Sequence, residues 1–443
     1  MSGEGIVGYP QRRNRHSRRA YRFGSSAALV ALAMAAGCSN SQPGVGSAGG
    51  SAPGVTSTSI TVGSIADISG PLSADFAPIT AGVQAYFSMV NAAGGVDGRK
   101  LVLGAQKDDQ GSSTTDLTVA QQLVEQDHVF AVVGVGTPFF GGASFLAHQG
   151  VPTFGYQVSS DWSAGPSLFG AFGSYLEFST GQMGFAYAAQ QLHAKSVGVI
   201  AYAVPQSAAA CQSAVTGFNA FGVPVGYQDL SFGFGADPTS DVLQMRDHGV
   251  DVVFTCLDVS GNVAFARAIA QNGVPARMVW LNGYDRSTLQ QYGSLLEGTV
   301  VALEHVPFEA AVEFPGAYPA MDSYLKEMQK YQPTHVYDEV AFDGWVDAVH
   351  FVDGLQAVGH NLTQAKVVHA LNAMTDYTAG GLVPPQNWTQ LHTSAGAGPF
   401  CGTSVQVVNG AFQARVHDGH QVFYCFARGS DVPVPPPAGT PGT

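Results

Sequence analysis

The chain has 443 residues, of which 45% are hydrophobic and only 12% are charged. This length suggests two or three domains, and the hydrophobic content suffices for a sizeable core. Six of the 19 basic residues and one of the 32 acidic residues lie in the first 37 positions, so the remainder carries a net charge of −18, which argues against binding to nucleic acid.

Residues 1–37 have the organisation of a secretory signal. An Arg-rich segment precedes a short apolar run at residues 27–36, which is about half the ~20 residues that a membrane-spanning helix needs. The tetrapeptide AAGC at residues 35–38 resembles the bacterial lipobox, in which the cysteine is lipidated. We therefore expect export and a lipid on Cys38 that anchors the protein to the outer face of the bacterial cell membrane. Residues 17–21 also resemble a twin-arginine signal, which leaves the export route open.

A linker at residues 38–58 follows the signal. It consists almost entirely of Ser, Gly, Pro, Ala, Val and Thr, a composition that predicts a flexible segment. The next ordered element is therefore expected to begin at about residue 59.

From residue 59, short runs rich in β-branched residues alternate with longer amphipathic segments. Such alternation is typical of parallel sheets covered by helices on both faces, so we predict an α/β fold with two doubly wound lobes. The predicted strands are 60–65, 101–105, 129–133 and 151–154 in a first series, and 197–201, 252–255, 278–281 and 299–303 in a second. Helical residues 317–359 and 363–375 follow, and then short strands at 404–408, 412–416 and 422–425.

Four cysteines remain after Cys38, and an even number in an exported chain indicates two disulfides with three possible pairings. Cys211 begins a helix after the first strand of the second series, and Cys256 ends the third strand. These strands are neighbours in a sheet ordered 2-1-3, which favours Cys211–Cys256. Cys401 and Cys425 bracket the terminal strands, which favours a local bridge. Four free thiols are the alternative.

Ligands of open parallel sheets bind at the carboxyl ends of the strands. The loops expected there are polar and Gly-rich, and their hydroxyls, amides and helix N-termini suit an anionic or polar small ligand. A Ser or Thr in such a loop can equally be a helix N-cap. Six aromatic residues could also line a cleft there or serve as core: Phe139, Phe140, Tyr156, Trp162, Tyr202 and Tyr284.

Signals of catalysis are weak. The sequence has no GxSxG, HExxH or GxxxxGK[ST] motif, and none of its 13 histidines has a metal-ligand spacing. We therefore expect no enzymatic activity, no metal and no cofactor. A secreted hydrolase that pairs Ser159 with a histidine is the alternative.

Three motifs carry a resemblance to a known family: SGPL at residues 69–72, NAAGGVDGRKL at 91–101 and YDEVAFD at 337–343. They resemble the type I periplasmic binding proteins of the leucine/isoleucine/valine- and amide-binding branch, and the similarity extends over residues 59–415. The resemblance implies two lobes joined by crossing strands near residues 173–177, 303–308 and 376–385. It also implies that the ligand binds between the lobes, which close by a hinge motion.

The predicted domain organisation combines the secretory signal and the linker with the two lobes. It assigns a signal peptide to 1–37, a linker to 38–58, the first lobe to 59–175 and 305–375, the second lobe to 176–304 and 376–428, and a disordered tail to 429–443.

The resemblance implies a solute-binding lipoprotein of an ABC importer that acts without chemistry. Its expected partners are a small polar solute (an amino acid, an amide or a related molecule), the permease subunits, and the membrane through the lipid anchor, with the protein itself a monomer. A sensor domain that presents its ligand to a membrane receptor is the alternative. The candidate ligand-binding residues are Thr137, Gln157, Ser159, Ser160, Tyr202, Gln206, Asp258, Tyr284 and Asp285.

Within this set, the resemblance implies the roles of a few positions. Thr137 matches a family serine that meets the ligand carboxylate, and Ser159 keeps one hydroxyl of a Ser-Ala-Thr stretch. Gln206 stands in place of a family tyrosine. Asn282, Asp285 and Asp258 are the candidates for an acid or amide that holds the ligand's ammonium group.

Overall fold

The computed structural model describes residues 52–175, 183–394 and 398–443. The signal, Cys38 and most of the linker lie outside the described residues. In the last part of the linker, Val55 is buried and forms a bridge with Ile60. The packed chain therefore begins a few residues before the predicted start at residue 59.

The first sheet contains five parallel strands in the order β2-β1-β3-β4-β5. Its central strands are apolar on both faces, as expected for parallel strands covered on two sides. The sequence did not predict the short edge strand β5. The bounds are β1 (Ser59–Ala66), β2 (Lys100–Asp108), β3 (Val132–Gly136), β4 (Thr153–Gly155) and β5 (Leu168–Gly170).

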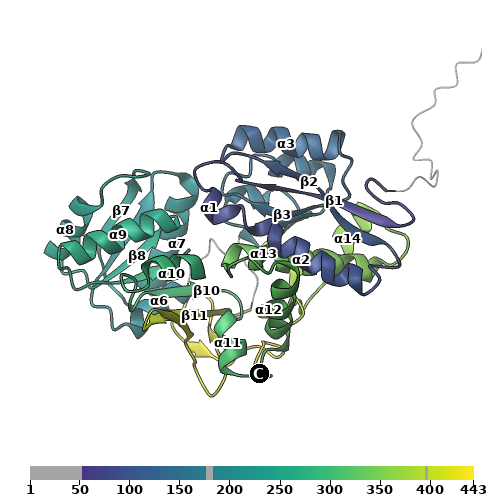
Figure 1. The fold of residues 1–443 in the computed structure, drawn as a ribbon. Helices are drawn as coiled ribbons and strands as arrows, with labels where there is room; N and C mark the ends of the chain where they lie inside the picture. The colour runs from purple at the N-terminus through teal and green to yellow at the C-terminus, as the bar shows by residue number, and fades with distance from the viewer. Residues whose placement is uncertain (1–51, 176–182, 395–397) are drawn as a thin grey trace, which may run out of the picture. The chain divides into compact units, whose positions relative to one another are not determined.

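Helices cover both faces of this sheet (Figure 1). On one face α3 and α4 pack on residues such as Ile65, and on the other α2 and α13 pack on residues such as Val62. Gly82 of α2 and Gly344 of α13 lie against the backbone of the facing helix, where a Cβ would collide. The helices of this first lobe within residues 59–175 are α1 (Ser73–Phe76), α2 (Ile79–Ala92), α3 (Ser113–Glu125), α4 (Ala143–Gln149) and the 3-10 turn η1 (Ser160–Ser163).

The second sheet begins with five parallel strands in the order β10-β9-β8-β6-β7. Strand β7 escaped prediction because it is a half-exposed edge strand of mixed polarity, VGYQDLSF. The bounds of the five parallel strands of the second sheet are β6 (Val197–Tyr202), β7 (Val225–Phe232), β8 (Val252–Cys256), β9 (Arg277–Trp280) and β10 (Val300–Leu303). The covering helices of this second lobe are α6 (Met183–Gln191), α7 (Pro205–Ala220), α8 (Thr239–Asp247), α9 (Val259–Gln271) and α10 (Arg286–Tyr292).

After β10 the chain divides between the two lobes. Helix α12 (Pro319–Tyr331) packs on α2, and α13 (Glu339–Val358) packs on α2, β3, β4 and α14 (Gln364–Leu371). Helix α11 (Phe308–Glu313) contacts both α12 and the second sheet. The predicted helical stretch 317–359 is thus two helices. The second one, α13, begins after Asp338, which caps it by accepting a hydrogen bond from the Ala341 amide at 2.8 Å.

The C-terminal strands extend the second sheet in antiparallel fashion. They are β11 (Phe400–Val408), β12 (Ala411–Ala414), β13 (Tyr424–Phe426) and β14 (Pro433–Val434). Strand β14 lies in the tail that we expected to be disordered, and its pairing with β13 gives that segment backbone partners.

Helix α15 (Trp388–Leu391) departs from the predicted domain boundaries. The Trp388 ring lies 5.2 Å from that of Phe169 in β5 and 5.1 Å from that of His350 in α13. Part of the segment 376–428, which we assigned to the second lobe, therefore packs on the first.

The cysteine pairing agrees with the favoured alternative. The sulfur atoms of Cys211 and Cys256 lie at bonding distance, and their Cα atoms are 5.8 Å apart. The sulfur atoms of Cys401 and Cys425 also lie at bonding distance, and their Cα atoms are 4.1 Å apart. The first pair meets because β6 and β8 are neighbours, as predicted. The second pair faces across β11 and β13.

Among the described residues, no helix combines the length and apolarity that crossing a membrane requires.

Candidate functional site

A cleft of about 1000 Å³, including its open mouth, lies where the carboxyl ends of the two parallel sheets approach each other. The first lobe contributes α1, the loops after β3 and β4, and the start of α13. The second lobe contributes the loops after β6, β8 and β9. The position of the cleft is the one expected for ligand binding in open parallel sheets.

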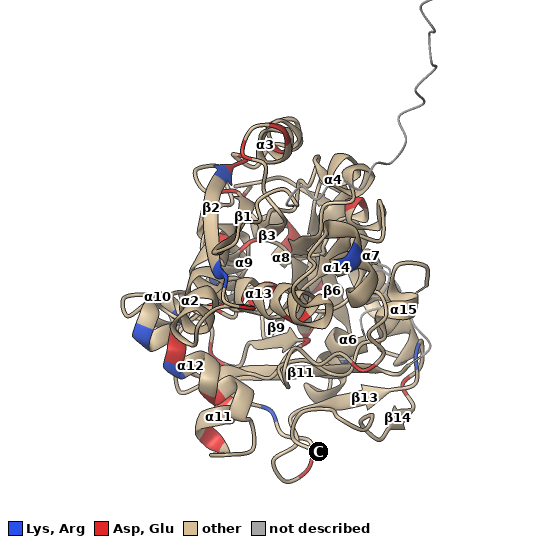
Figure 2. Cartoon of the chain, turned by 90° about the vertical axis from the view of Figure 1, so that its right-hand side faces the viewer, with Lys and Arg blue, Asp and Glu red and all other residues tan. Residues whose placement is uncertain are grey.

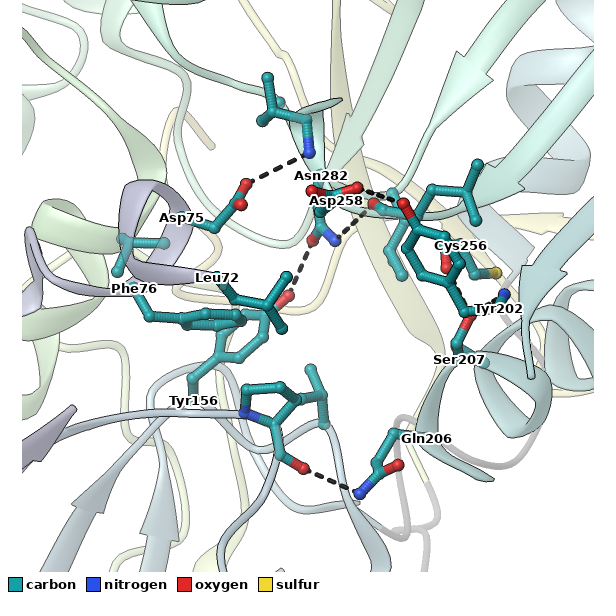
Figure 3. Close-up of a pocket in the computed structure, with 18 of the residues that line it drawn as sticks. Leu72, Asp75, Phe76, Tyr156, Tyr202, Gln206, Ser207, Cys256, Asp258 and Asn282 are labelled. Carbon is teal, nitrogen blue, oxygen red and sulfur yellow. Dashed lines mark hydrogen bonds between the residues drawn. The ribbon is translucent and has the colours of Figure 1, made fainter. Parts of the chain in front are cut away.

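Aromatic and aliphatic side chains form most of the cleft walls. On the first lobe, the Phe76 and Tyr156 rings lie 5.4 Å apart, with Leu72 beside them (Figure 3). On the second lobe, the Tyr202 ring stacks on Phe234 at 3.9 Å. A solute that binds here contacts apolar surface on both sides.

Among the described residues, two backbone hydrogen bonds join the lobes at the cleft, from the Glu339 amide to the Tyr284 carbonyl at 3.0 Å and from the Arg286 amide to the Tyr337 carbonyl at 3.1 Å. Three further hydrogen bonds that involve side chains also cross from one lobe to the other. The Tyr156 hydroxyl donates to Oδ1 of Asn282 at 2.9 Å. Nε2 of Gln206 donates to the Pro138 carbonyl at 3.0 Å, and the Val259 amide donates to Oδ1 of Asp75 at 3.3 Å. The two lobes are therefore in direct polar contact around the cleft.

The remaining hydroxyls of the cleft also donate to protein acceptors. The Tyr202 hydroxyl donates to Oδ1 of Asp258, and the Ser207 hydroxyl donates to the Cys256 carbonyl at 2.5 Å. The Tyr284 hydroxyl donates to the Glu309 carboxylate. These groups hold the loops in place.

Five carboxylates line the cleft: Asp75, Asp258, Asp285, Asp338 and Glu339. Three of them are helix N-caps, since Asp258 accepts from the Gly261 amide, Asp285 from Ser287 and Asp338 from Ala341. The lining contains no Lys, Arg or His among the residues that the structure describes.

Asp75 differs from the three capping residues because it caps no helix and projects from α1. Burial, followed by repulsion from Asp258, raises the pKa of its carboxyl from 3.8 to about 7, although the hydrogen bond from the Val259 amide opposes this. Weaker repulsion comes from Asp285 and Asp67. The neighbouring carboxylates are thus close enough to disfavour a charge on Asp75.

Five of the nine predicted ligand-binding residues line the cleft. They are Tyr202, Gln206, Asp258, Tyr284 and Asp285. Of the six aromatic candidates, Phe139, Tyr156, Tyr202 and Tyr284 line it, whereas Phe140 and Trp162 are buried in the first lobe's core.

The other four predicted residues lie nearby but outside the lining. The buried Thr137 hydroxyl accepts a hydrogen bond from the Phe139 amide at 3.1 Å, and Gln157 is buried against Gly170. The Ser159 hydroxyl donates to Asp161 at 2.9 Å, and Ser160 is exposed at the start of η1. The geometry therefore turns the first lobe's candidate hydroxyls away from the cleft.

Sequence reasoning missed several lining residues. Leu72 immediately precedes the short helix α1, and Asp75 and Phe76 lie within it. Glu339 comes from the start of α13, where only the family motif at 337–343 marked the position. Phe234 follows the unpredicted strand β7. The pattern of strands alone marked none of these positions.

A cluster of three acids, Asp67, Asp108 and Asp109, lies at the end of β1 and β2, with carboxylate oxygens within 4.8 Å of one another. Asp67 accepts from the Gly70 and Leu72 amides, and Asp108 accepts from Ile68 and Ser69. Because these oxygens hold the backbone of the loop, we assign the cluster a structural role.

Comparison with known proteins identifies the fold. No curated protein matches the sequence. Among solved structures, a fatty acid ABC transporter substrate-binding protein from Thermomonospora curvata is similar with 18% identity and a TM-score of 0.69, covering 88% of this chain and 97% of that one. A solute-binding protein of an ABC transporter from R. palustris, in complex with 4-hydroxybenzoate, is 17% identical with a TM-score of 0.66, covering 81% and 95%.

A third structure is that of a branched-chain amino acid transporter substrate-binding protein from Streptococcus pneumoniae in complex with isoleucine. It is 17% identical with a TM-score of 0.64, covering 81% of this chain and 98% of that one. A family model described as "Periplasmic binding protein" matches residues 59–411. Two parallel sheets with a shared cleft at their carboxyl ends agree with this match, and the chain belongs to the periplasmic binding protein family.

Proposed function

We propose that this protein is the extracytoplasmic solute receptor of an ABC importer, which captures a small molecule in the cleft between its lobes and delivers it to the permease. The observation that carries the proposal is one cleft lined by the strand-end loops of both sheets. Family membership supports it, because proteins of this family bind small solutes. The hydrogen bonds that cross the cleft are the contacts that stabilise the closed form.

We further propose that the solute leaves unchanged. Ser159, the nucleophile of the alternative hydrolase, donates to Asp161 and lies outside the cleft lining. The Ser207 hydroxyl, which does line the cleft, is held by the Cys256 carbonyl. Among the described residues, neither serine is hydrogen-bonded to a histidine, which is the contact that activates a nucleophile.

Cys38 lies outside the described residues, and its lipidation remains part of the proposal. A lipidated chain fractionates with the membrane and is released into the soluble fraction by Cys38→Ala. Retention of the Cys38→Ala variant on the membrane contradicts the anchor without affecting the solute-binding proposal.

The test of solute binding is mass spectrometry of small molecules released from the purified full-length protein, followed by calorimetry of each candidate. A cleft-filling variant, Val204→Trp, is expected to abolish binding, because Val204 lines the cleft at the start of α7. The matched control is Val312→Trp, at a 68% exposed position on α11 that is absent from the lining. If no solute is released and a broad metabolite panel gives no heat, the receptor proposal fails.

A further inference from the structure

We propose that the cleft selects a solute that combines a cationic nitrogen with an apolar body, such as an aromatic or aliphatic amine or a quaternary ammonium compound. This inference rests on the proposed function and names the chemical class of its ligand. Four features of the lining carry it: the free hydrogen-bonding groups, the state of the helix N-termini, the carboxylates and the aromatic walls.

Among the described residues, the side-chain hydroxyls of the cleft are occupied as donors, whereas acceptor oxygens of Gln206 and Asp75 are left free. The hydroxyls of Tyr156, Tyr202, Ser207 and Tyr284 all donate to protein atoms. By contrast, Oε1 of Gln206 has no hydrogen-bond partner, and within the described residues the only hydrogen bond to the Asp75 carboxylate is the one that Oδ1 accepts. A surface with spare acceptors recognises a donor, and an ammonium group consists of donors only.

The helix N-termini around the cleft are already capped. Helices α9, α10 and α13 begin next to the lining, but the carboxylates of Asp258, Asp285 and Asp338 accept from their first-turn amides. Helix α7 begins with Pro205, which has no N–H to offer. A ligand carboxylate therefore lacks the amide-lined, positively polarised sites that we expected from the sequence.

The carboxylates near Asp75 lack a basic partner. Among the described cleft carboxylates, Asp338 contacts Nε2 of His335 at 2.6 Å and Glu339 contacts Nε2 of His305 at 3.5 Å. Within the described residues, Asp75, Asp258 and Asp285 have no such contact, and Asp258 and Asp285 both disfavour a charge on Asp75. In the wider molecule, basic residues are few and scattered, for example on β2, α10 and α12 (Figure 2). A cation that enters beside Asp75 relieves this repulsion.

The aromatic walls suit both parts of such a solute. Phe76 and Tyr156 on one side, and Tyr202 and Phe234 on the other, present ring surfaces to the cleft. Ring faces attract organic cations and also bury hydrocarbon. The apolar body therefore packs on the walls while the charged nitrogen lies against Asp75.

The test compares three ligands of similar shape and different charge: 2-phenylethylamine, 2-phenylethanol and 3-phenylpropionate. Calorimetry on the full-length protein at pH 8 is expected to show the amine binding at least about tenfold more tightly than the alcohol, as for a hydrogen bond to a charged group, and to show no binding of the carboxylate. Asp75→Asn is expected to remove the preference for the amine over the alcohol. Asp247→Asn, an exposed residue on α8, changes net charge equally and is expected to keep the preference.

The pH dependence gives a second readout. Because the pKa of Asp75 is about 7, its charged fraction rises about tenfold between pH 6 and pH 8, while the amine stays protonated. Amine affinity in the wild type is expected to rise by about the same factor, and to stay flat in Asp75→Asn. The charged groups facing Asp75, namely Asp258, Asp285 and Asp67, remain in both proteins.

Two outcomes overturn the inference. One is a preference for the carboxylate or the alcohol over the amine, and the other is an amine preference that survives Asp75→Asn. Either leaves the receptor proposal standing, provided that another solute binds and Val204→Trp blocks it. If neither the three ligands nor a metabolite panel binds, both proposals fail together.

Discussion

The Tyr156 hydroxyl donates a hydrogen bond to Oδ1 of Asn282, although the two residues lie 126 positions apart and belong to different lobes. Tyr156 follows β4 at the carboxyl end of the first sheet, and Asn282 follows β9 at that of the second. Asn282 is itself held by a hydrogen bond from its Nδ2 to the Leu257 carbonyl at 3.1 Å. The contact thus links both sheets directly at the cleft (Figure 3).

Tyr156→Phe tests this link. The variant keeps the ring that packs on Phe76 but loses the bond across the cleft, so the closed form loses about 1 kcal/mol and solute affinity falls by about fivefold. Calorimetry with the native solute measures the change. Tyr227→Phe is the control, because the Tyr227 hydroxyl bonds to Asp241 within the second lobe. Equal affinities of Tyr156→Phe and the wild type contradict the prediction.

Phe234→Ala tests the aromatic wall. The side chain is 51% exposed, so its removal is expected to change the free energy of unfolding by less than about 1 kcal/mol. It does, however, stack on Tyr202 and line the cleft, so solute affinity is expected to fall by about three- to tenfold. Val312→Ala on α11 serves as the exposed control. A large loss of thermal stability in Phe234→Ala shows that the residue supports the fold instead.

The disulfides are expected to differ in their contributions to stability. The Cys211–Cys256 pair spans 45 positions and the Cys401–Cys425 pair spans 24. The chain-entropy relation gives about 4 kcal/mol for the first loop and about 3.5 kcal/mol for the second. Thermal unfolding of the double serine variants measures this, and we expect the larger drop in Tm for Cys211→Ser/Cys256→Ser. An unchanged Tm of that variant indicates that the link stabilises little.

Buried acids on α13 are expected to make stability fall as the pH rises. Both oxygens of Asp343 and of Asp347 are buried without a hydrogen-bond partner. Burial raises the pKa of each carboxyl well above 3.8, and repulsion from Glu339 adds to the rise at Asp343. The folded state therefore holds protons that the unfolded state releases. This stabilisation is complete below pH 3.8 and is lost, at about 1.4 kcal/mol per pH unit for each group, as the pH rises through the folded-state pKa.

Asp347→Asn isolates one of these groups. The amide has nearly the same shape and no charge, so the variant is expected to lose less stability than the wild type between pH 5 and pH 9. Denaturant unfolding across this range measures the slope. Asp322→Asn, exposed on α12, is expected to leave the slope unchanged. Parallel curves for Asp347→Asn and the wild type rule out a protonated Asp347 in the folded state.

The strands that the sequence predicted are those that appear in it as runs of apolar residues. Central parallel strands such as β1 and β8 are buried on both faces and appear as unbroken apolar runs. Strand β7 is half-exposed at an edge and of mixed polarity, so it leaves no such run. The cystine pairing was also predictable, because the order 2-1-3 places β6 beside β8 and brings Cys211 to Cys256.

The candidate site was harder to predict than the fold. The sequence indicated which loops lie at the carboxyl ends of the strands, but the direction of each side chain depends on the backbone path of its loop. Thr137 and Ser159 lie in the expected loops and turn to partners within the first lobe. Asp75, by contrast, lies in the short helix α1 and lines the cleft.

By itself, the sequence determined the alternation of strands and helices and favoured the cystine pairing that the structure has, because these follow from local hydrophobic periodicity and from the rules of parallel sheets. Only the tertiary structure decided that acceptors and carboxylates, and not hydroxyl donors, face the cleft. The physical reason is that hydrogen bonding in a crowded site is competitive. Each hydroxyl of Tyr156, Tyr202, Ser207 and Tyr284 donates to an acceptor from a distant part of the chain, such as Asn282 for Tyr156, and no local pattern records that partner.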